Sequence, residues 1–271
     1  MNGRWLVTPI PRPHARTRLV CFPYAGGGAS LFRTWGRELP PSIEVSAVQP
    51  PGREDRAGEP ALTDLRAVAR SAAEAMAPLT GSDYVLFGHS MGALLAFETA
   101  RRLRAMRCRA PRALLLSAHV APHFAAHRER ICDLSDDEFI DRLVAMEGTP
   151  RALFEQPELL SFFLPILRAD FTACDTYELG DEPPLDVPFA LFAGDADATM
   201  PAAEVDAWRS HTTAPCTFRI FPGGHFFLQS AREAVLAAVA RIIDNEQGGV
   251  PSWQKAPPQP FTSTEAPGTK S

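Results

Sequence analysis

Short apolar runs alternate with longer amphipathic segments along most of this 271-residue chain. This alternation predicts an α/β fold, with a mostly parallel central sheet and helices on both of its faces. The predicted strands are residues 17–23, 43–49, 83–88, 112–117, 187–193 and 217–222. The predicted helices are residues 62–79, 91–107, 136–146, 157–179 and 226–244. Residues 1–245 are therefore expected to form one domain.

One long stretch interrupts the alternation. Residues 121–185 show helical patterns and no strand pattern. A strand-free insertion of this length in an α/β sheet predicts a helical lid over one end of the sheet. After residue 245 the chain is rich in Pro, Gly, Ser and Thr, so residues 246–271 are expected to be a disordered tail.

Composition excludes several classes of protein. The formal net charge of -5 argues against a general nucleic-acid binder. No apolar stretch approaches the length of about 20 residues that a membrane helix needs, and no signal-peptide pattern opens the chain. The five cysteines include no C-x-x-C pair, which predicts reduced thiols in a cytoplasmic protein and neither disulfides nor a zinc site.

A G-x-S-x-G pattern spans residues 88–92, between a predicted strand and a predicted helix. In that context it predicts a sharp turn that holds Ser90 in a strained conformation at the helix N-terminus. The turn leaves no room for side chains at Gly88 and Gly92. Ser90 is therefore the candidate nucleophile; the alternative is an ordinary serine in a glycine-rich turn.

A serine nucleophile needs a base, and His225 is the favoured candidate among seven histidines. It lies in a loop between the last predicted strand and the last predicted helix, at the sheet edge where Ser90 is expected. His89 is expected to point away from the nucleophile. His119, His123 and His127 lie at the start of the insertion and are interpreted as solvated or structural.

An acidic partner for the histidine is expected between the serine and the histidine in the chain. Asp195 and Asp197 both follow the fifth predicted strand. Because their side chains point in different directions, only one of them is able to face His225. Position alone does not decide between them, and either could be a turn aspartate that caps its own backbone.

Two backbone N–H groups are needed to stabilise an oxyanion. Met91, directly after the serine, supplies one. The glycine-rich loop at residues 24–28 supplies the other, from Tyr24 or Ala25. Phosphate binding by this loop is disfavoured, because the sequence lacks the P-loop lysine and the G-x-G-x-x-G spacing.

Several other features are given structural interpretations. Glu98 is expected to make a structural hydrogen bond. Four arginines are candidates for binding an acidic partner, but they are interpreted as solvated: Arg53, Arg56, Arg101 and Arg102. Apolar residues at helical spacing in the insertion either pack the lid or line an acyl pocket: Phe139, Leu143, Leu160, Phe163, Ile166 and Leu167.

Four sequence blocks together resemble the type II thioesterases, the stand-alone editing hydrolases of polyketide and nonribosomal peptide synthesis. They are LVCFPYAGGGASLFRTW at 19–35, VQPPGRE at 48–54, FGHSMGALLAFETARRL at 87–103 and FPGGHFFL at 221–228. The resemblance extends from about residue 17 to residue 244 and implies an α/β-hydrolase fold. No counterpart is recognised for the tail.

The resemblance also implies site residues and a substrate class. The family's acid lies in a G-x-x-D pattern, which corresponds to Gly194 and Asp197 and favours Asp197 over Asp195. Ala25 corresponds to the first oxyanion donor, beside Met91. The implied activity is cleavage of acyl thioesters from the phosphopantetheine arm of an acyl or peptidyl carrier protein, by a monomer without metal or cofactor.

Two alternative functions share this fold. A small-molecule carboxylesterase or lipase would carry the same triad and differ in its lid and partner surface. A catalytically inactive hydrolase that serves as a binding protein would typically lack a triad residue, and all three candidates are present here.

Overall fold

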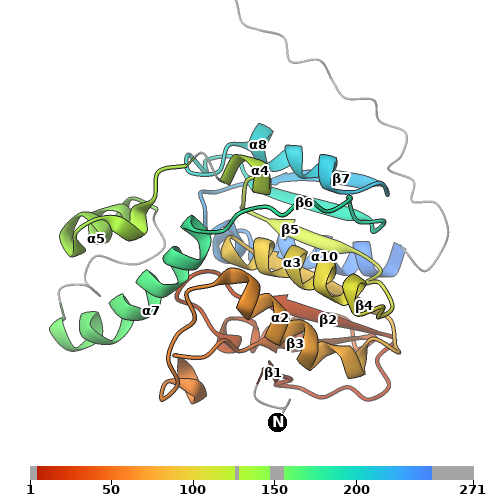
Figure 1. Ribbon diagram of the computed structural model, residues 1–271. Helices are drawn as coiled ribbons and strands as arrows, with labels where there is room; N and C mark the ends of the chain where they lie inside the picture. Colours follow the sequence, from red (N-terminus) through yellow and green to blue (C-terminus); the bar gives the residue numbers. More distant parts are fainter. Residues whose placement is uncertain (1–4, 126–127, 147–155, 246–271) are drawn as a thin grey trace, which may run out of the picture.

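The computed structural model describes residues 5–125, 128–146 and 156–245. Its centre is a seven-stranded sheet in the order β1-β3-β2-β4-β5-β6-β7 (Figure 1). The strands are β1 Leu6–Val7, β2 Thr17–Phe22, β3 Ile43–Val48, β4 Tyr84–His89, β5 Leu114–Ser117, β6 Phe189–Gly194 and β7 Cys216–Phe221. All neighbouring strands pair in parallel except β1 and β3. The predicted mostly parallel α/β sheet is confirmed.

The six predicted strands agree with the structure to within two residues. β1 was not predicted, because two residues at a sheet edge are too short to produce a periodic pattern. It pairs antiparallel with β3, placing Leu6 opposite Val48.

The described helices follow the predicted order. The α-helices are α1 Trp35–Glu38, α2 Leu65–Met76, α3 Met91–Ala105, α4 Pro122–Ala125, α5 Asp136–Ala145, α7 Pro157–Asp175, α8 Ala202–Asp206, α9 Phe227–Ser230 and α10 Arg232–Asn245. The 3-10 helices are η2 Ala29–Phe32, η3 Glu54–Arg56, η4 Ala77–Leu79, η5 Ile131–Asp133 and η6 Ala207–His211.

The predicted helix 157–179 ends at Asp175, and two other differences from the predicted helices have local reasons. α2 begins three residues late, because the Asp64 side chain caps it by accepting the Arg66 and Ala67 N–H groups at 2.9 and 3.3 Å. The predicted helix at 226–244 is split into α9 and α10 at Ala231, which has a non-helical φ of -109°.

Alternate residues of the central strands enter different hydrophobic cores on the two faces of the sheet. Val20 of β2 packs in the core formed with α2 and α3, whereas Leu19 packs in the core formed with α1 and α10. α2 and α3 lie in front of the sheet in Figure 1, and α10 lies behind it. Both faces are therefore covered by helices, as predicted.

The described residues between β5 and β6 form helices and one isolated bridge, between Leu185 and Thr212. α5 and α7 project beyond the sheet in Figure 1 and share a small core of their own. Phe139, Leu143 and Leu167 lie in that core, which supports the packing interpretation for these three residues. The predicted tail, 246–271, lies outside the described residues. No helix in the described part of the chain has the length and apolar character that crossing a membrane requires.

Phe32 provides a test of the core behind the sheet. Its side chain is fully buried, edge-on to Trp35 and Phe87 with ring centroids 5.1 and 6.2 Å away. We expect Phe32→Ala to lower the free energy of unfolding by about 3–5 kcal/mol, because it leaves a cavity among aromatic rings. Ile220→Ala is the control, since Ile220 is 52% exposed, and should change it by less than about 0.5 kcal/mol. Urea unfolding measures both values, and equal losses would contradict this description of the core.

Candidate active site

Ser90 lies in a strained turn between β4 and α3. Its φ of 55° and ψ of -124° lie outside the regions that L-residues ordinarily adopt. The Ser90 N–H donates to the Ser117 carbonyl at the end of β5, with a nitrogen–oxygen distance of 2.8 Å. The turn is therefore held from the neighbouring strand.

The two glycines of the turn lie where no side chain fits. A Cβ atom on Gly88 would lie 1.9 Å from the Gly92 carbonyl oxygen, and one on Gly92 would lie 2.2 Å from the Phe22 carbonyl oxygen. Both contacts are with backbone, which cannot rotate away as a side chain does. The expectation that both positions must lack side chains is confirmed.

The Ser90, His225 and Asp197 side chains form a continuous chain of hydrogen bonds. The Ser90 Oγ atom lies 3.0 Å from His225 Nε2, and His225 Nδ1 lies 2.8 Å from Asp197 Oδ2. The three residues follow β4, β7 and β6, whose carboxyl ends share one edge of the sheet. The side chains of His225 and Asp197 are both buried.

Asp197 is held as a carboxylate. Burial raises the pKa of its carboxyl, but hydrogen bonds from His225 and Thr199 outweigh burial and leave the pKa below its ordinary value. Asp197 Oδ1 accepts the Thr199 N–H and Oγ–H at 2.9 and 2.6 Å. Because a carboxylate only accepts hydrogen bonds, His225 must donate from Nδ1, which leaves the Nε2 lone pair facing the Ser90 hydroxyl.

Asp195 has a different position and different contacts. It is exposed, and its Oδ1 atom accepts the Gly223 N–H at 2.8 Å. This bond ties the turn after β6 to the loop that carries His225. Of the two aspartates left open by position, Asp197 is the one that contacts His225.

His89 is buried and points away from the Ser90 hydroxyl. Its Nε2 donates to the His225 carbonyl at 3.0 Å, and its Nδ1 accepts from Ser117 Oγ at 2.9 Å. Burial, assisted by His225, lowers its pKa to about 3, so the ring is neutral. His89 therefore holds the His225 backbone in place.

The other histidines take structural or surface positions. His119 is buried, and its Nδ1 donates to the Val120 carbonyl at 2.8 Å. Burial lowers the pKa of His119 to about 4. His123 and His211 pair with each other at 2.8 Å, His14 is exposed, and His127 lies outside the described residues.

A cleft of about 100 Å³ opens beside the Ser90 hydroxyl. The core domain contributes Ala25, Ser90, Met91, His119, Thr199 and Met200. The insertion contributes Arg128, Glu129, Ile131, Met146, Phe171, Cys174 and Asp175. The sequence patterns did not single out Phe171, Cys174 or Ile131 as pocket residues, because their spacing does not distinguish a cleft wall from a core.

Ala25 and Met91 both line this cleft. Met91 is the first residue of α3, so its N–H has no partner within the helix. Within the described chain, the Ala25 N–H donates to no protein acceptor. Free backbone donors of this kind are what an oxyanion site requires, so Ala25 and Met91 stay the candidate donors beside Ser90. The described residues contain no cluster of three or more potential metal ligands.

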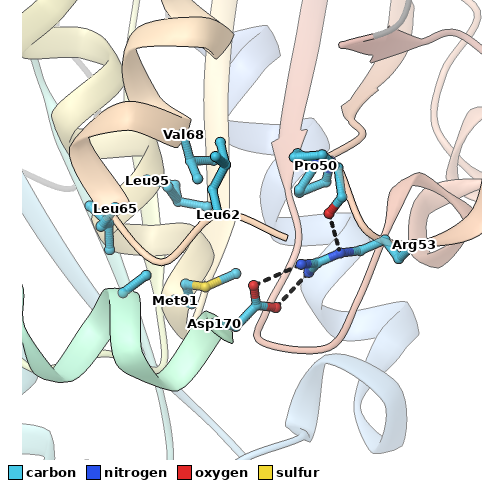
Figure 2. Close-up of a pocket in the computed structure, with 10 residues that line it drawn as sticks. Pro50, Arg53, Leu62, Leu65, Val68, Met91, Leu95 and Asp170 are labelled. Carbon is cyan, nitrogen blue, oxygen red and sulfur yellow. Dashed lines mark hydrogen bonds and ion pairs between the residues drawn. The ribbon is translucent and has the colours of Figure 1, made fainter. Parts of the chain in front are cut away.

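Three of the four arginines expected at the surface are buried instead. Arg53 forms an ion pair with Asp170 of α7 (Figure 2), and Arg56 forms one with Glu59. The expectation of solvated side chains was wrong for Arg53, Arg56 and Arg101, because the folded chain supplies each with a carboxylate. Arg102 is exposed, as expected.

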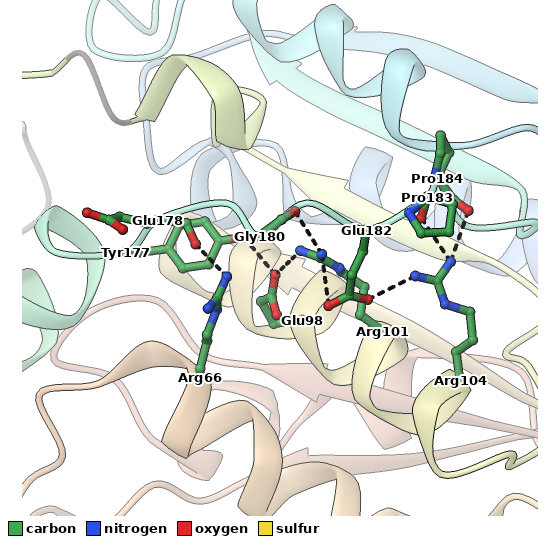
Figure 3. A network of polar contacts seen from close by, with 10 residues as sticks. All are labelled: Arg66, Glu98, Arg101, Arg104, Tyr177, Glu178, Gly180, Glu182, Pro183 and Pro184. Atoms are coloured by element: carbon green, nitrogen blue, oxygen red, sulfur yellow. Dashed lines mark hydrogen bonds and ion pairs between the residues drawn. The ribbon is translucent and has the colours of Figure 1, made fainter.

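Glu98 makes the structural contacts that were expected of it. Its Oε1 atom accepts from Arg101 at 2.6 Å and from the Tyr177 hydroxyl at 2.7 Å (Figure 3). The ion pair lies within α3, and Tyr177 follows α7. This network therefore ties the end of the insertion to the core.

The two aspartates provide a test of the site. We expect Asp197→Asn to lower kcat by about 10⁴-fold, because a neutral amide no longer fixes the His225 tautomer or stabilises the imidazolium. Asp195→Asn is the matched control and should stay within a few-fold of the unchanged enzyme. Steady-state hydrolysis of an acyl thioester measures both. A larger loss from Asp195→Asn would reverse the assignment.

A family model described as "Thioesterase domain" matches residues 17–245. The chain is 37% identical to the gramicidin S biosynthesis protein GrsT of Aneurinibacillus migulanus, over 89% of this chain and 94% of the relative. It is 42% identical to a Brevibacillus parabrevis protein named linear gramicidin dehydrogenase LgrE, over 90% of this chain and 94% of the relative. The structure of the type II thioesterase BorB from the borrelidin biosynthetic cluster matches with a TM-score of 0.81 at 37% identity, covering 88% of this chain and 97% of that one. The chain therefore belongs to the thioesterase domain family and, within it, to the type II thioesterases.

Proposed function

We propose that this thioesterase hydrolyses acyl groups from the phosphopantetheine arm of acyl or peptidyl carrier proteins, and so edits polyketide or nonribosomal peptide assembly lines. The observation that carries the chemistry is the hydrogen-bonded chain from Ser90 through His225 to Asp197, opening on a cleft. The pathway context is supported by relatives such as GrsT and the type II thioesterase YbtT from the yersiniabactin pathway, which is 31% identical with a TM-score of 0.81.

In the first half-reaction, we propose that Ser90 Oγ attacks the thioester carbonyl while His225 Nε2 takes the hydroxyl proton. Asp197 stabilises the imidazolium that forms. The carbonyl oxygen becomes an oxyanion that accepts hydrogen bonds from the Ala25 and Met91 N–H groups. The carbon–sulfur bond then breaks, and the thiol leaves with the proton from His225.

The second half-reaction repeats these steps with water. His225 takes a proton from water, the resulting hydroxide attacks the acyl–Ser90 ester, and the same N–H groups stabilise the oxyanion. The ester bond breaks, Ser90 recovers its proton from His225, and the free acid leaves. The thiol that leaves in the first half-reaction has a pKa of about 8.5, far below that of an alcohol, so its departure needs less help from a general acid.

The insertion at 121–185 is proposed to act as a lid that forms the acyl-binding wall. Phe171 and Cys174 of α7 and Ile131 of η5 line the cleft opposite Ser90. An acyl chain bound to Ser90 would therefore lie between the core and the insertion.

The cysteines are all free thiols, which supports the proposed cytoplasmic location.

The name of one relative points to dehydrogenase chemistry, which is a separate hypothesis. The sequence contains a single G-x-G, at residues 26–28, and the third glycine of the dinucleotide fingerprint is missing there. That loop presents the Ala25 N–H to the Ser90 cleft, a position that suits an oxyanion. A small-molecule esterase remains the alternative that shares the whole site.

The proposed function is tested by comparing three substrates with the same acyl group. These are an acylated carrier protein, the matching acyl-pantetheine and the matching p-nitrophenyl ester. We expect the highest kcat/KM with the carrier protein. Ser90→Ala should abolish hydrolysis of all three, because it removes the nucleophile, while circular dichroism shows an unchanged fold. Preferential ester turnover with an inert carrier would favour the esterase, and near-normal hydrolysis by Ser90→Ala would refute the site.

A further inference from the structure

Helix α7 of the insertion packs directly on the glycine loop at residues 24–28. Asp170 Oδ2 accepts the Gly26 N–H, with a nitrogen–oxygen distance of 2.7 Å. One turn earlier, Leu167 lies so close that a Cβ atom on Gly26 would be 2.6 Å from its Cδ2 atom. The residue next to the oxyanion donor Ala25 is thus held by a side chain that lies 144 positions away in the sequence.

Arg53 fixes Asp170 from the other side. Its two terminal nitrogens donate to the two carboxylate oxygens at 2.5 and 2.8 Å (Figure 2). Arg53 also donates to the Gly27 carbonyl at 3.2 Å and to the Pro51 carbonyl at 3.3 Å. The side chains are 4% and 5% exposed, so the pair is shielded from water and salt.

The glycine loop needs support from outside itself. Gly26 has a φ of +79°, and three successive glycines have little intrinsic preference for one conformation. The Gly26 N–H belongs to the peptide bond that follows Ala25, so fixing its direction fixes the peptide plane on the C-terminal side of Ala25. The φ and ψ angles of Ala25 alone separate that plane from the one that carries the Ala25 N–H. Asp170 holds the N–H of Gly26, and Arg53 holds the carbonyl of Gly27.

We propose that Asp170, oriented by Arg53, is a positioning residue that aims the Ala25 N–H at the oxyanion. This inference rests on the proposed function, in which Ala25 is an oxyanion donor. The helix that carries Asp170 also carries Phe171 and Cys174 into the acyl cleft. Contact with the acyl group and geometry of the oxyanion site thus depend on one helix. An acyl group that displaces α7 should therefore lower kcat and leave binding less affected.

The principal test is Asp170→Asn in the full-length enzyme. An asparagine must place an N–H donor against either Arg53 or Gly26, so one of these contacts is lost. We expect kcat for thioester hydrolysis to fall by about 10- to 100-fold, with KM changed by less than about threefold. A misplaced oxyanion donor weakens stabilisation of the transition state more than binding of the substrate. The rate at which a fluorophosphonate labels Ser90 should fall in parallel, since the adduct places an oxygen in the same site.

A second variant separates positioning from folding. The double substitution Arg53→Met with Asp170→Leu removes both buried charges and nearly preserves volume, so its unfolding midpoint should stay close to that of the unchanged enzyme. It still leaves the Gly26 N–H without its acceptor. We expect the low kcat and slow labelling of Asp170→Asn to persist in this stable background.

Glu98→Gln is the matched control, because it weakens another buried pair that ties the α7 region to the core without touching the glycine loop (Figure 3). It should lower the unfolding midpoint and leave kcat and labelling within twofold. The pH profile of kcat/KM should be unchanged in Asp170→Asn, since the contacts of His225 are intact.

The two proposals fail in different ways. Suppose that the wild-type enzyme is active and Ser90→Ala is inactive. Unchanged kcat and labelling rate in Asp170→Asn would then overturn the positioning role alone. Equal losses of kcat in Glu98→Gln would also overturn it, because they would show a general effect of instability. A wild-type enzyme that neither hydrolyses thioesters nor labels at Ser90 would overturn the proposed function and this inference with it.

Discussion

The candidate site depends on one close approach of backbone to backbone, where the start of α3 meets the end of β2. Gly92 lies so close to the Phe22 carbonyl that a single methyl group would separate the two segments. This approach brings the first N–H of α3 beside the loop that follows β2. Met91 and Ala25 therefore line the same cleft as Ser90. A looser turn would leave the serine in place and separate the two donors.

The strain at Ser90 persists because the surrounding structure determines it from several sides. A residue in such a conformation costs about 1–3 kcal/mol, which packing elsewhere must offset. α3 is buried along most of its length, and the Ser90 N–H is held by the last residue of β5. His89 adds a second connection, because its ring links Ser117 to the backbone of His225. The turn and the loop that carries the base are thus fixed to the same strand end.

The sequence was informative where chemistry follows local pattern. The G-x-S-x-G pattern between a strand and a helix nominated Ser90. Because parallel strands end at one edge of the sheet, the positions of His225 and of the aspartate pair after later strands nominated those residues as its partners. The side-chain alternation predicted that one aspartate alone would face the histidine, and Asp197 was selected by resemblance to a family pattern. In the structure Asp197 contacts His225, and Asp195 accepts the Gly223 N–H in the loop that carries His225.

What the sequence did not predict are contacts between distant segments. Arg53 in a loop after β3 has the appearance of a solvated charge, because its partner lies 117 residues away on a helix of the insertion. Its burial depends on how α7 crosses the domain, and no local pattern encodes that crossing. β1 escaped detection for a similar reason, since its identity as a strand comes from its pairing with β3.

The nature of the Arg53–Asp170 pair favours a geometric role over a stabilising one. Removing two charges from water costs several kcal/mol for each ion, and apolar side chains of similar volume often stabilise a protein as well or better. Apolar groups, however, do not fix direction. A carboxylate held by two hydrogen bonds from a guanidinium group has one orientation. The direction of the Gly26 N–H, which donates to this carboxylate, is therefore fixed as well. A loop of three glycines otherwise has many conformations, and a directional hydrogen bond selects one of them, which hydrophobic packing does not. This hydrogen bond comes from the helix that also lines the acyl cleft.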